Sequence, residues 1–150
     1  MKSIKSCINL SLLIASIGYS ACSLSHTAGA TLGADGVNAS ATALAAVSCF
    51  DDGNGQPEGL FAQIKDMSEP VPSLLINLQL YKGIQATSTT DTVSGDAEYS
   101  AGVQLNAGPG VYQMILDKTD IGPRQFDVIW HCMTIDHTHT GTDITVRQFQ

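Results

Sequence analysis

Residues 73–82 read Ser-Leu-Leu-Ile-Asn-Leu-Gln-Leu-Tyr-Lys, and this stretch decides the fold class. Apolar side chains recur at every second position, namely Leu74, Ile76, Leu78 and Leu80. Side chains alternate between the two faces of a β-strand, so this spacing places all four on one face. The stretch therefore predicts a strand with one buried face and one face turned to solvent.

The same period continues on the C-terminal side of this stretch. Tyr99, Ala101, Val103 and Leu105 form a second stripe, and residues 106–110 then interrupt it with Asn-Ala-Gly-Pro-Gly. Alternation resumes over 111–117, where Tyr112, Met114 and Leu116 share a face. Two strands joined by a short Gly/Pro loop predict a β-hairpin.

A third stripe follows the turn at 119–123, and it ends in a cysteine. Its members are Phe126, Val128, Trp130 and Cys132. Further candidate strands are residues 47–51, 60–65, 85–92 and 142–149. Helical periodicity is hard to find, and no helical crossovers separate the strands. The sequence therefore predicts an all-β fold, an antiparallel β-sandwich of about seven or eight strands.

Composition limits both the size and the function of the chain. Its 150 residues suffice for one domain of ordinary size. Hydrophobic residues make up 43% and charged residues 14%, and the formal charge is −7. Low charge density argues against a coiled coil. An acidic surface repels phosphate, so a nucleic-acid-binding protein is not expected.

The N-terminus has the pattern of a bacterial-type secretory signal peptide, over residues 1–23. Lys2 and Lys5 precede an apolar run at 8–17, which is too short to span a bilayer. Cleavage could follow the small residues at 21–23 or those at 28–30. Cys22 also allows lipidation of a new N-terminal cysteine, which would tether the protein to a membrane.

Residues 24–46 are mostly Ala, Ser, Thr and Gly. Such a stretch can bury little apolar area against the entropy of ordering it, and so it predicts a flexible linker. The β-sandwich domain is then expected over 47–150. A periplasmic or extracellular protein follows from the leader, lipid-anchored if Cys22 is acylated.

Cys49 and Cys132 are the two cysteines of the predicted domain. In an oxidising compartment the simplest prediction is one disulfide between them, with free thiols or metal ligation as alternatives. The bridge would hold the first strand onto the body, with Trp130 packed nearby.

Two runs resemble a known family. Residues 75–81 read Leu-Ile-Asn-Leu-Gln-Leu-Tyr, and residues 103–112 read Val-Gln-Leu-Asn-Ala-Gly-Pro-Gly-Val-Tyr. They resemble the bacterial pre-peptidase C-terminal type of secreted β-sandwich, in which Leu-x-Leu-Tyr ends one strand and Gly-x-Tyr opens a later one. The resemblance covers about 73–133 and implies an extracytoplasmic domain with a binding or accessory role. It supplies no catalytic residues, and the cysteine pair is not part of its pattern.

Polar chemistry gathers in two places. His131, Asp136, His137 and His139 could form a surface site for zinc or copper, which imidazole suits, although a polar hairpin loop is the commoner structure for residues 136–140. Residues 51–58 read Asp-Asp-Gly-Asn-Gly-Gln-Pro-Glu, an oxygen-rich turn that calcium could use. The calcium loop pattern of helix–loop–helix proteins fails there, and a solvated loop is favoured.

No nucleophile motif, phosphate-binding loop or carboxylate pair can be nominated, so an enzyme is not expected. The first hypothesis is an exported non-enzymatic β-sandwich with a binding or accessory role at the bacterial envelope. It would bind an unknown protein or glycan partner, no nucleic acid, no cofactor, and a membrane only through Cys22. The alternative is a periplasmic zinc or copper binder. A fibre subunit that pairs strands between protomers is a third hypothesis.

Overall fold

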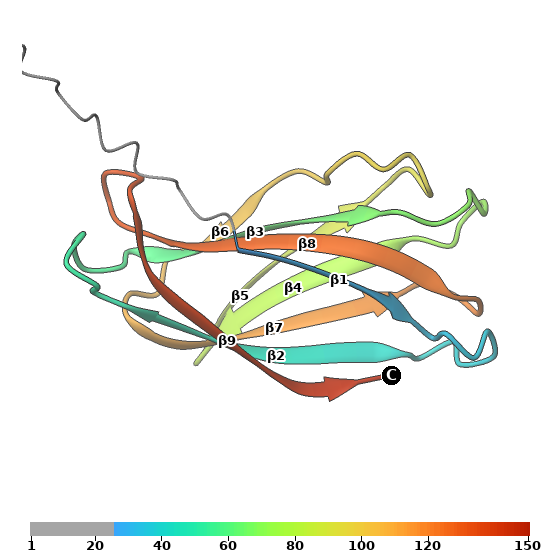
Figure 1. The fold of residues 1–150 in the computed structure, drawn as a ribbon, viewed down its shortest axis with the longest axis horizontal. Coiled ribbons are helices and arrows are strands. Elements are labelled where there is room, and N and C mark those ends of the chain that lie inside the picture. The colour runs from blue at the N-terminus through green and yellow to red at the C-terminus, as the bar shows by residue number, and fades with distance from the viewer. Residues whose placement is uncertain (1–25) are drawn as a thin grey trace, which may run out of the picture.

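The computed structural model describes residues 26–150, which form nine β-strands and no helix (Figure 1). The described residues hold no helix that is long and apolar enough to cross a membrane. The strands are β1 (His26–Leu32), β2 (Thr42–Phe50), β3 (Gly59–Asp66), β4 (Ile76–Lys82), β5 (Gln85–Asp91), β6 (Val103–Leu105), β7 (Gly110–Lys118), β8 (Arg124–Met133) and β9 (His139–Phe149).

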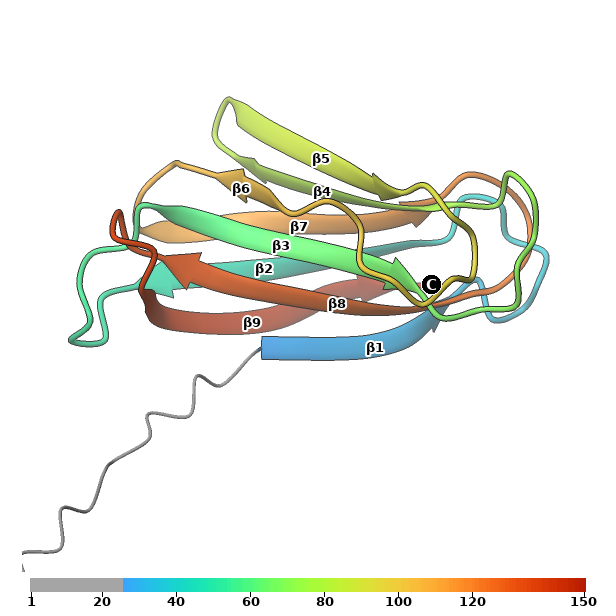
Figure 2. The same ribbon diagram turned by 90° about the horizontal axis from the view of Figure 1, so that it is seen from above.

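All strand pairs are antiparallel, and they form two layers that face each other (Figure 2). One layer has the order β5-β4-β7-β2-β9, and the other consists of β6, β3, β8 and β1. Strand β9 joins the two layers, because its first residues pair with β8 and the rest pairs with β2. The predicted all-β fold is confirmed, as a sandwich that is nearly closed into a barrel.

The core lies between the two layers and is built from the predicted stripes. Leu74, Ile76, Leu78 and Leu80 are all buried, and so are the inward residues of β7 and β8. Each strand contributes every second side chain, as the pleat requires. These inward residues are Tyr112, Met114, Leu116, Phe126, Val128, Trp130 and Cys132.

The predicted hairpin between 99–105 and 111–117 is wrong. Strand β6 is short and pairs with β3 in one layer, whereas β7 pairs with β2 and β4 in the other. Residues 106–109 therefore cross between the layers. Alternation shows which side chains face the core, but strands that face each other across a core alternate in the same way as hairpin partners. Tyr99 and Ala101 are exposed rather than inward.

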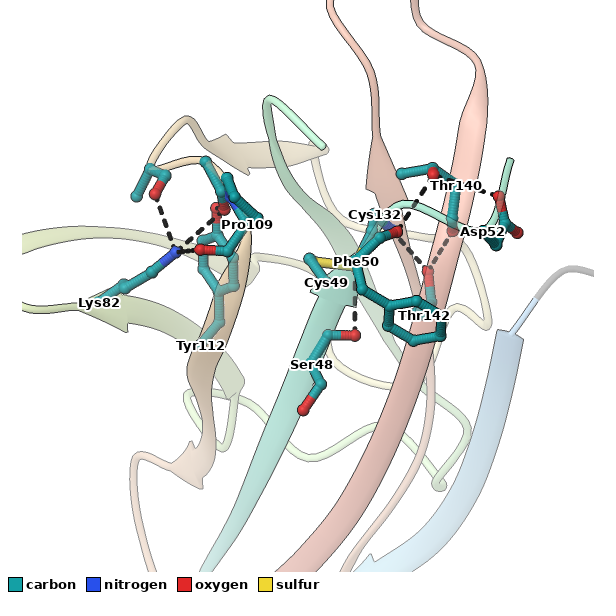
Figure 3. Close-up of a disulfide and its surroundings, with 12 residues drawn as sticks. Ser48, Cys49, Phe50, Asp52, Lys82, Pro109, Tyr112, Cys132, Thr140 and Thr142 are labelled. Atoms are coloured by element: carbon teal, nitrogen blue, oxygen red, sulfur yellow. Dashed lines mark hydrogen bonds between the residues drawn. A yellow bond between two sulfur atoms is a disulfide. The ribbon is translucent and has the colours of Figure 1, made fainter. Parts of the chain in front are cut away.

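A half-buried lysine holds this crossing in place (Figure 3). Lys82 Nζ donates to the carbonyl oxygens of Ala107 (2.9 Å), Gly108 (3.0 Å) and Pro109. It also lies 4.6 Å from the centre of the Tyr112 ring. Burial lowers the pKa of Lys82, and the carbonyl oxygens offset that cost by accepting hydrogen bonds.

The prediction of a flexible linker over 24–46 is wrong from His26 onward. Residues 26–32 form β1, and β2 begins at Thr42. Small residues are required here: a side chain at Gly29 would collide with the Asp127 carboxylate and the Phe126 carbonyl on β8. The predicted signal peptide and Cys22 lie outside the described residues.

The predicted disulfide is confirmed. Cys49 on β2 and Cys132 on β8 are bonded, with their Cα atoms 5.5 Å apart, so the bridge joins the two layers (Figure 3). The Cys132 N–H donates to Thr142 Oγ1 on β9 (3.0 Å), which adds the joining strand to the same unit. A structural disulfide indicates an oxidising, non-cytoplasmic compartment.

Candidate functional site

The barrel is incomplete between β1 and β9, and we call this gap the seam. Strand β1 pairs along one edge with β8. Strand β9 pairs with β8 only at His139 and Thr140, and from Gly141 onward it pairs with β2. Among residues 26–150 no strand pairs with the facing edges of β1 and β9, so each turns main-chain N–H and C=O groups toward the other. Because both are antiparallel to β8, β1 and β9 run in the same direction.

The seam opens into an apolar pocket of about 160 Å³. This volume is close to the roughly 150 Å³ of an engineered cavity that takes up benzene. The pocket therefore has room for one aromatic ring or one branched aliphatic side chain. It is lined by Ala28, Gly29, Ala30, Ala43, Leu44, Ala45, Met114, Leu116, Phe126, Val128, Trp130, Ile144, Val146 and Phe149.

The rim of this pocket exposes apolar side chains to solvent. Val146 is 64% exposed and Phe149 is 47% exposed, both on β9. Ala28 is exposed on the facing strand β1. Apolar surface beside unpaired strand edges is typical of an interaction site rather than of a finished barrel wall.

Both ends of the seam are closed. At one end the β8–β9 hairpin brings Thr140 beside Cys132. At the other end the Gly33 N–H donates to the carbonyl oxygen of Gln150 (3.1 Å). Between these closed ends, Ala28, Ala30 and Ile144 line the pocket.

Trp130 forms part of the inner wall of the pocket, and its side chain is almost fully buried. Within residues 26–150 its indole Nε1 has no hydrogen-bond partner, and neither does the buried Nδ1 of His26. The two rings have their centres 6.1 Å apart. A polar side chain without a partner at a pocket wall is a group that a bound molecule could satisfy.

Two more imidazoles lie beside this wall. The rings of His131 and His139 are stacked, with centres 4.1 Å apart, and the ring of His26 is 6.1 Å from that of His131. His131 is 8% exposed. Burial, followed by the charges of His139 and His26, lowers the pKa of His131 to about 4. His131 is therefore neutral near pH 7.

The structure does not gather the predicted metal ligands into one site. His131 and His139 lie together, whereas Asp136 and His137 are exposed in the 134–138 turn. Among residues 26–150 no three His, Cys, Asp or Glu side chains are grouped so that they could hold a metal ion. The lone pair of an imidazole nitrogen lies in the plane of its ring. Because the rings of His131 and His139 are stacked at an interplanar angle of 16°, their lone pairs do not converge on one metal position. The spacing of the histidines remains the only support for a metal site.

The oxygen-rich turn at 51–58 uses its carboxylates internally. Asp51 Oδ1 accepts from the N–H groups of Gly53 (2.8 Å) and Gly55 (3.1 Å). Asp52 Oδ1 accepts from Asn54 N–H (3.2 Å) and from Thr140 Oγ1 (3.3 Å; Figure 3). These hydrogen bonds stabilise the turn locally and connect it to Thr140 on β9, which agrees with the interpretation of residues 51–58 as a solvated loop.

Sequence reasoning missed the seam. The composition of residues 24–46 predicts a linker where one wall lies, and the alternation at 142–149 predicts only a final strand for the other. The available signal is the spacing of Ile144 and Val146 beside the exposed Phe149, together with the run of small residues at 27–31 in β1. Neither feature says that the two strands lie opposite each other.

We compared the chain with family models, curated proteins and solved structures, and none of the three comparisons gave a match. The resemblance to pre-peptidase C-terminal domains therefore stays a prediction.

Proposed function

We propose that the chain is an exported, non-catalytic protein of the bacterial envelope that binds a partner protein through the seam. The observation that carries this proposal is that two unpaired strand edges face each other above an apolar pocket. Unpaired main-chain N–H and C=O groups can form hydrogen bonds with the main chain of another strand, and an apolar pocket can bury an apolar side chain of that strand. A protein supplies both, whereas a glycan supplies neither.

The pocket lining supports binding rather than catalysis. All of its side chains are apolar except for the indole N–H of Trp130. Proton transfer and nucleophilic attack need an ionisable or nucleophilic group within hydrogen-bond reach of the substrate. The lining residues offer no such group.

Export is supported by the leader pattern at residues 1–23 and by the disulfide between Cys49 and Cys132. The mature protein would be periplasmic or extracellular, and acylation of Cys22 would keep it at a membrane. Without Lys2 and Lys5, five bases face fourteen acids and the formal charge is −9. Such a surface is unsuited to nucleic acid.

Site-specific cross-linking in a bacterium that exports the protein tests the proposal. A photo-reactive residue is placed on either wall of the seam, at Ala28 or at Val146, and a control is placed at the exposed Ile84 in the β4–β5 turn. We expect both wall positions, but not position 84, to trap the same protein. The trapped chain should come from the exported fraction and lack its leader.

Two results would contradict the proposal. One is a pair of wall positions that trap nothing beyond what position 84 traps. The other is a cytosolic product that still carries residues 1–23.

A further inference from the structure

The direction of the two seam strands selects the direction of a strand that could bind there. Strands β1 and β9 run in the same direction, because both are antiparallel to β8. An added strand that is antiparallel to β1 is therefore also antiparallel to β9. Every pair in this fold is antiparallel, so such a strand would continue the hydrogen-bond pattern of both layers.

The size of the pocket limits what the added strand can insert. A volume of about 160 Å³ accepts one phenylalanine-sized group and not a row of large side chains. The wall formed by Ala28, Gly29 and Ala30 carries small side chains, which leaves room above it. One large apolar side chain is therefore the anchor.

The charge of the molecule selects the kind of partner. Four of the five bases in residues 26–150 are held by internal partners: Lys65 by Asp127, Arg124 by Asp66, and Lys82 and Lys118 by carbonyl oxygens. Fourteen acids face these five bases. Two copies of this chain repel each other at long range, whereas a basic segment is attracted. Asp143 is exposed on β9, whereas Asp127 beside β1 is paired with Lys65 and the fifth base, Arg147, is exposed on β9. The attraction of a basic segment therefore comes from the net charge of the whole molecule.

We propose that the seam binds an extended, basic segment of a different protein as an antiparallel β-strand, with one large apolar side chain seated in the pocket. This inference rests on the proposed function and names the chemistry of the partner. The segment pairs along β1 between the two closed ends of the seam. Its main chain bonds to the unpaired edges, and its basic ends face the acidic surface.

Synthetic peptides test each part of this proposal on the mature protein. The reference peptide is Thr-Lys-Thr-Thr-Phe-Thr-Thr-Lys-Thr, in which Phe is the one large side chain on its face and both Lys lie on the opposite face. Three matched peptides change one property each: Phe to Ala, both Thr residues beside Phe to Pro, and both Lys to Glu. Binding is followed by the fluorescence of Trp130, the sole tryptophan of the chain and part of the pocket wall.

We expect the reference peptide to bind and to shift the Trp130 emission. The Ala peptide should bind at least about tenfold more weakly than the reference, because it loses the affinity that burial of one phenyl group contributes. The Pro peptide should bind at least as weakly as the Ala peptide, because it lacks main-chain donors. The Glu peptide should bind more weakly than the reference, and added salt should narrow that difference.

Two variants of the protein provide a matched pair on β1. Ala28→Phe fills the mouth of the pocket, whereas Thr27→Phe places the same ring on the neighbouring exposed position, which does not line the pocket. We expect Ala28→Phe to weaken the reference peptide at least about tenfold and Thr27→Phe to leave its affinity within about twofold. If Ala28→Phe does not fold, the peptide series on the unaltered protein still decides.

The proposal is overturned if the Phe and Ala peptides bind equally, or if the Pro peptide binds as well as the reference. Preferential binding of the Glu peptide overturns its charge requirement. A dimer in sedimentation that Ala28→Phe abolishes and Thr27→Phe preserves would make a second copy the occupant, and would overturn it too. If no peptide binds while cross-linking from Ala28 and Val146 still succeeds, this inference fails and the proposed function stands.

Discussion

The fold changes the acid–base chemistry of His131, because burial and two neighbouring imidazoles lower its pKa. Its imidazole is packed against His139 and lies near His26, and both neighbours would add positive charge on protonation. Burial and these two rings all lower the pKa of His131, so the fold favours the neutral ring. The cluster lies where β1 begins and where the β8–β9 hairpin turns back, at one end of the seam.

We expect the protein to lose stability as the pH falls from 6.5 toward 4. The pKa of His131 is about 4 in the folded protein against an ordinary 6.5, so the unfolded chain binds the proton more tightly. The contribution lost between pH 7 and pH 5 is about 2 kcal/mol. Urea unfolding at both pH values measures it.

The matched variants for this measurement are His131→Phe and His137→Asn. The first keeps an aromatic ring but cannot titrate, and it should remove about 2 kcal/mol of the pH dependence. The second changes an exposed histidine in the turn, where the backbone φ of 58° suits asparagine, and should leave the dependence unchanged. Equal pH profiles for His131→Phe and the unaltered protein would contradict the role of His131.

Trp130 tests the inner wall of the pocket. Its side chain is 3% exposed, so Trp130→Ala should destabilise the protein by about 3–5 kcal/mol in urea unfolding. Trp130→Phe keeps a ring in place and should cost less. A nearly neutral Trp130→Ala would mean that the indole is not part of the core.

At the scale of elements, sequence reasoning succeeded where a strand has one buried face. The stripes of β4, β7 and β8 were predictable because large apolar side chains alternate with polar ones in each. It failed for β1, because alanine, glycine and threonine show no contrast between the two faces. It also failed for the partner of β6, because alternation records which side of a strand is buried and not which strand lies beside it.

The disulfide is expected to stabilise the link between β2 and β8. Cys49 and Cys132 are separated by 83 positions, so the bridge restricts a large loop in the unfolded chain. Its removal should cost on the order of 4 kcal/mol. Urea unfolding of the Cys49→Ala/Cys132→Ala double variant, compared with the oxidised protein, measures this cost. Unchanged stability would show that the two layers hold together without it.

The position of β1 predicts where a signal peptide over residues 1–23 would be removed. Cleavage after residues 28–30 would delete most of β1 and open the edge of β8. Cleavage at residues 21–23 would preserve the strand. We expect mass spectrometry of the exported protein to find an N-terminus before His26. A mature chain that begins at Thr31 would show that β1 is not part of the working protein.

At the scale of the whole molecule, the sandwich was predictable and its open side was not. Strand number, turn residues and alternation indicate two packed layers, and the cysteines indicate how the layers are joined. The seam depends on β9 leaving β8 after Thr140 to pair with β2, while β1 takes the vacated edge of β8. That exchange involves strands more than a hundred residues apart, and no local pattern records it.

Native-state amide hydrogen exchange of the unbound protein tests most directly whether β1 and β9 turn unpaired edges toward the seam. We expect alternate amides of β1 to exchange rapidly, while amides of β2 and β7, which are paired on both edges, stay protected. Protection of every β1 amide to the level of β2 would contradict this, because it would mean that the barrel is closed and that no edge is available to a partner.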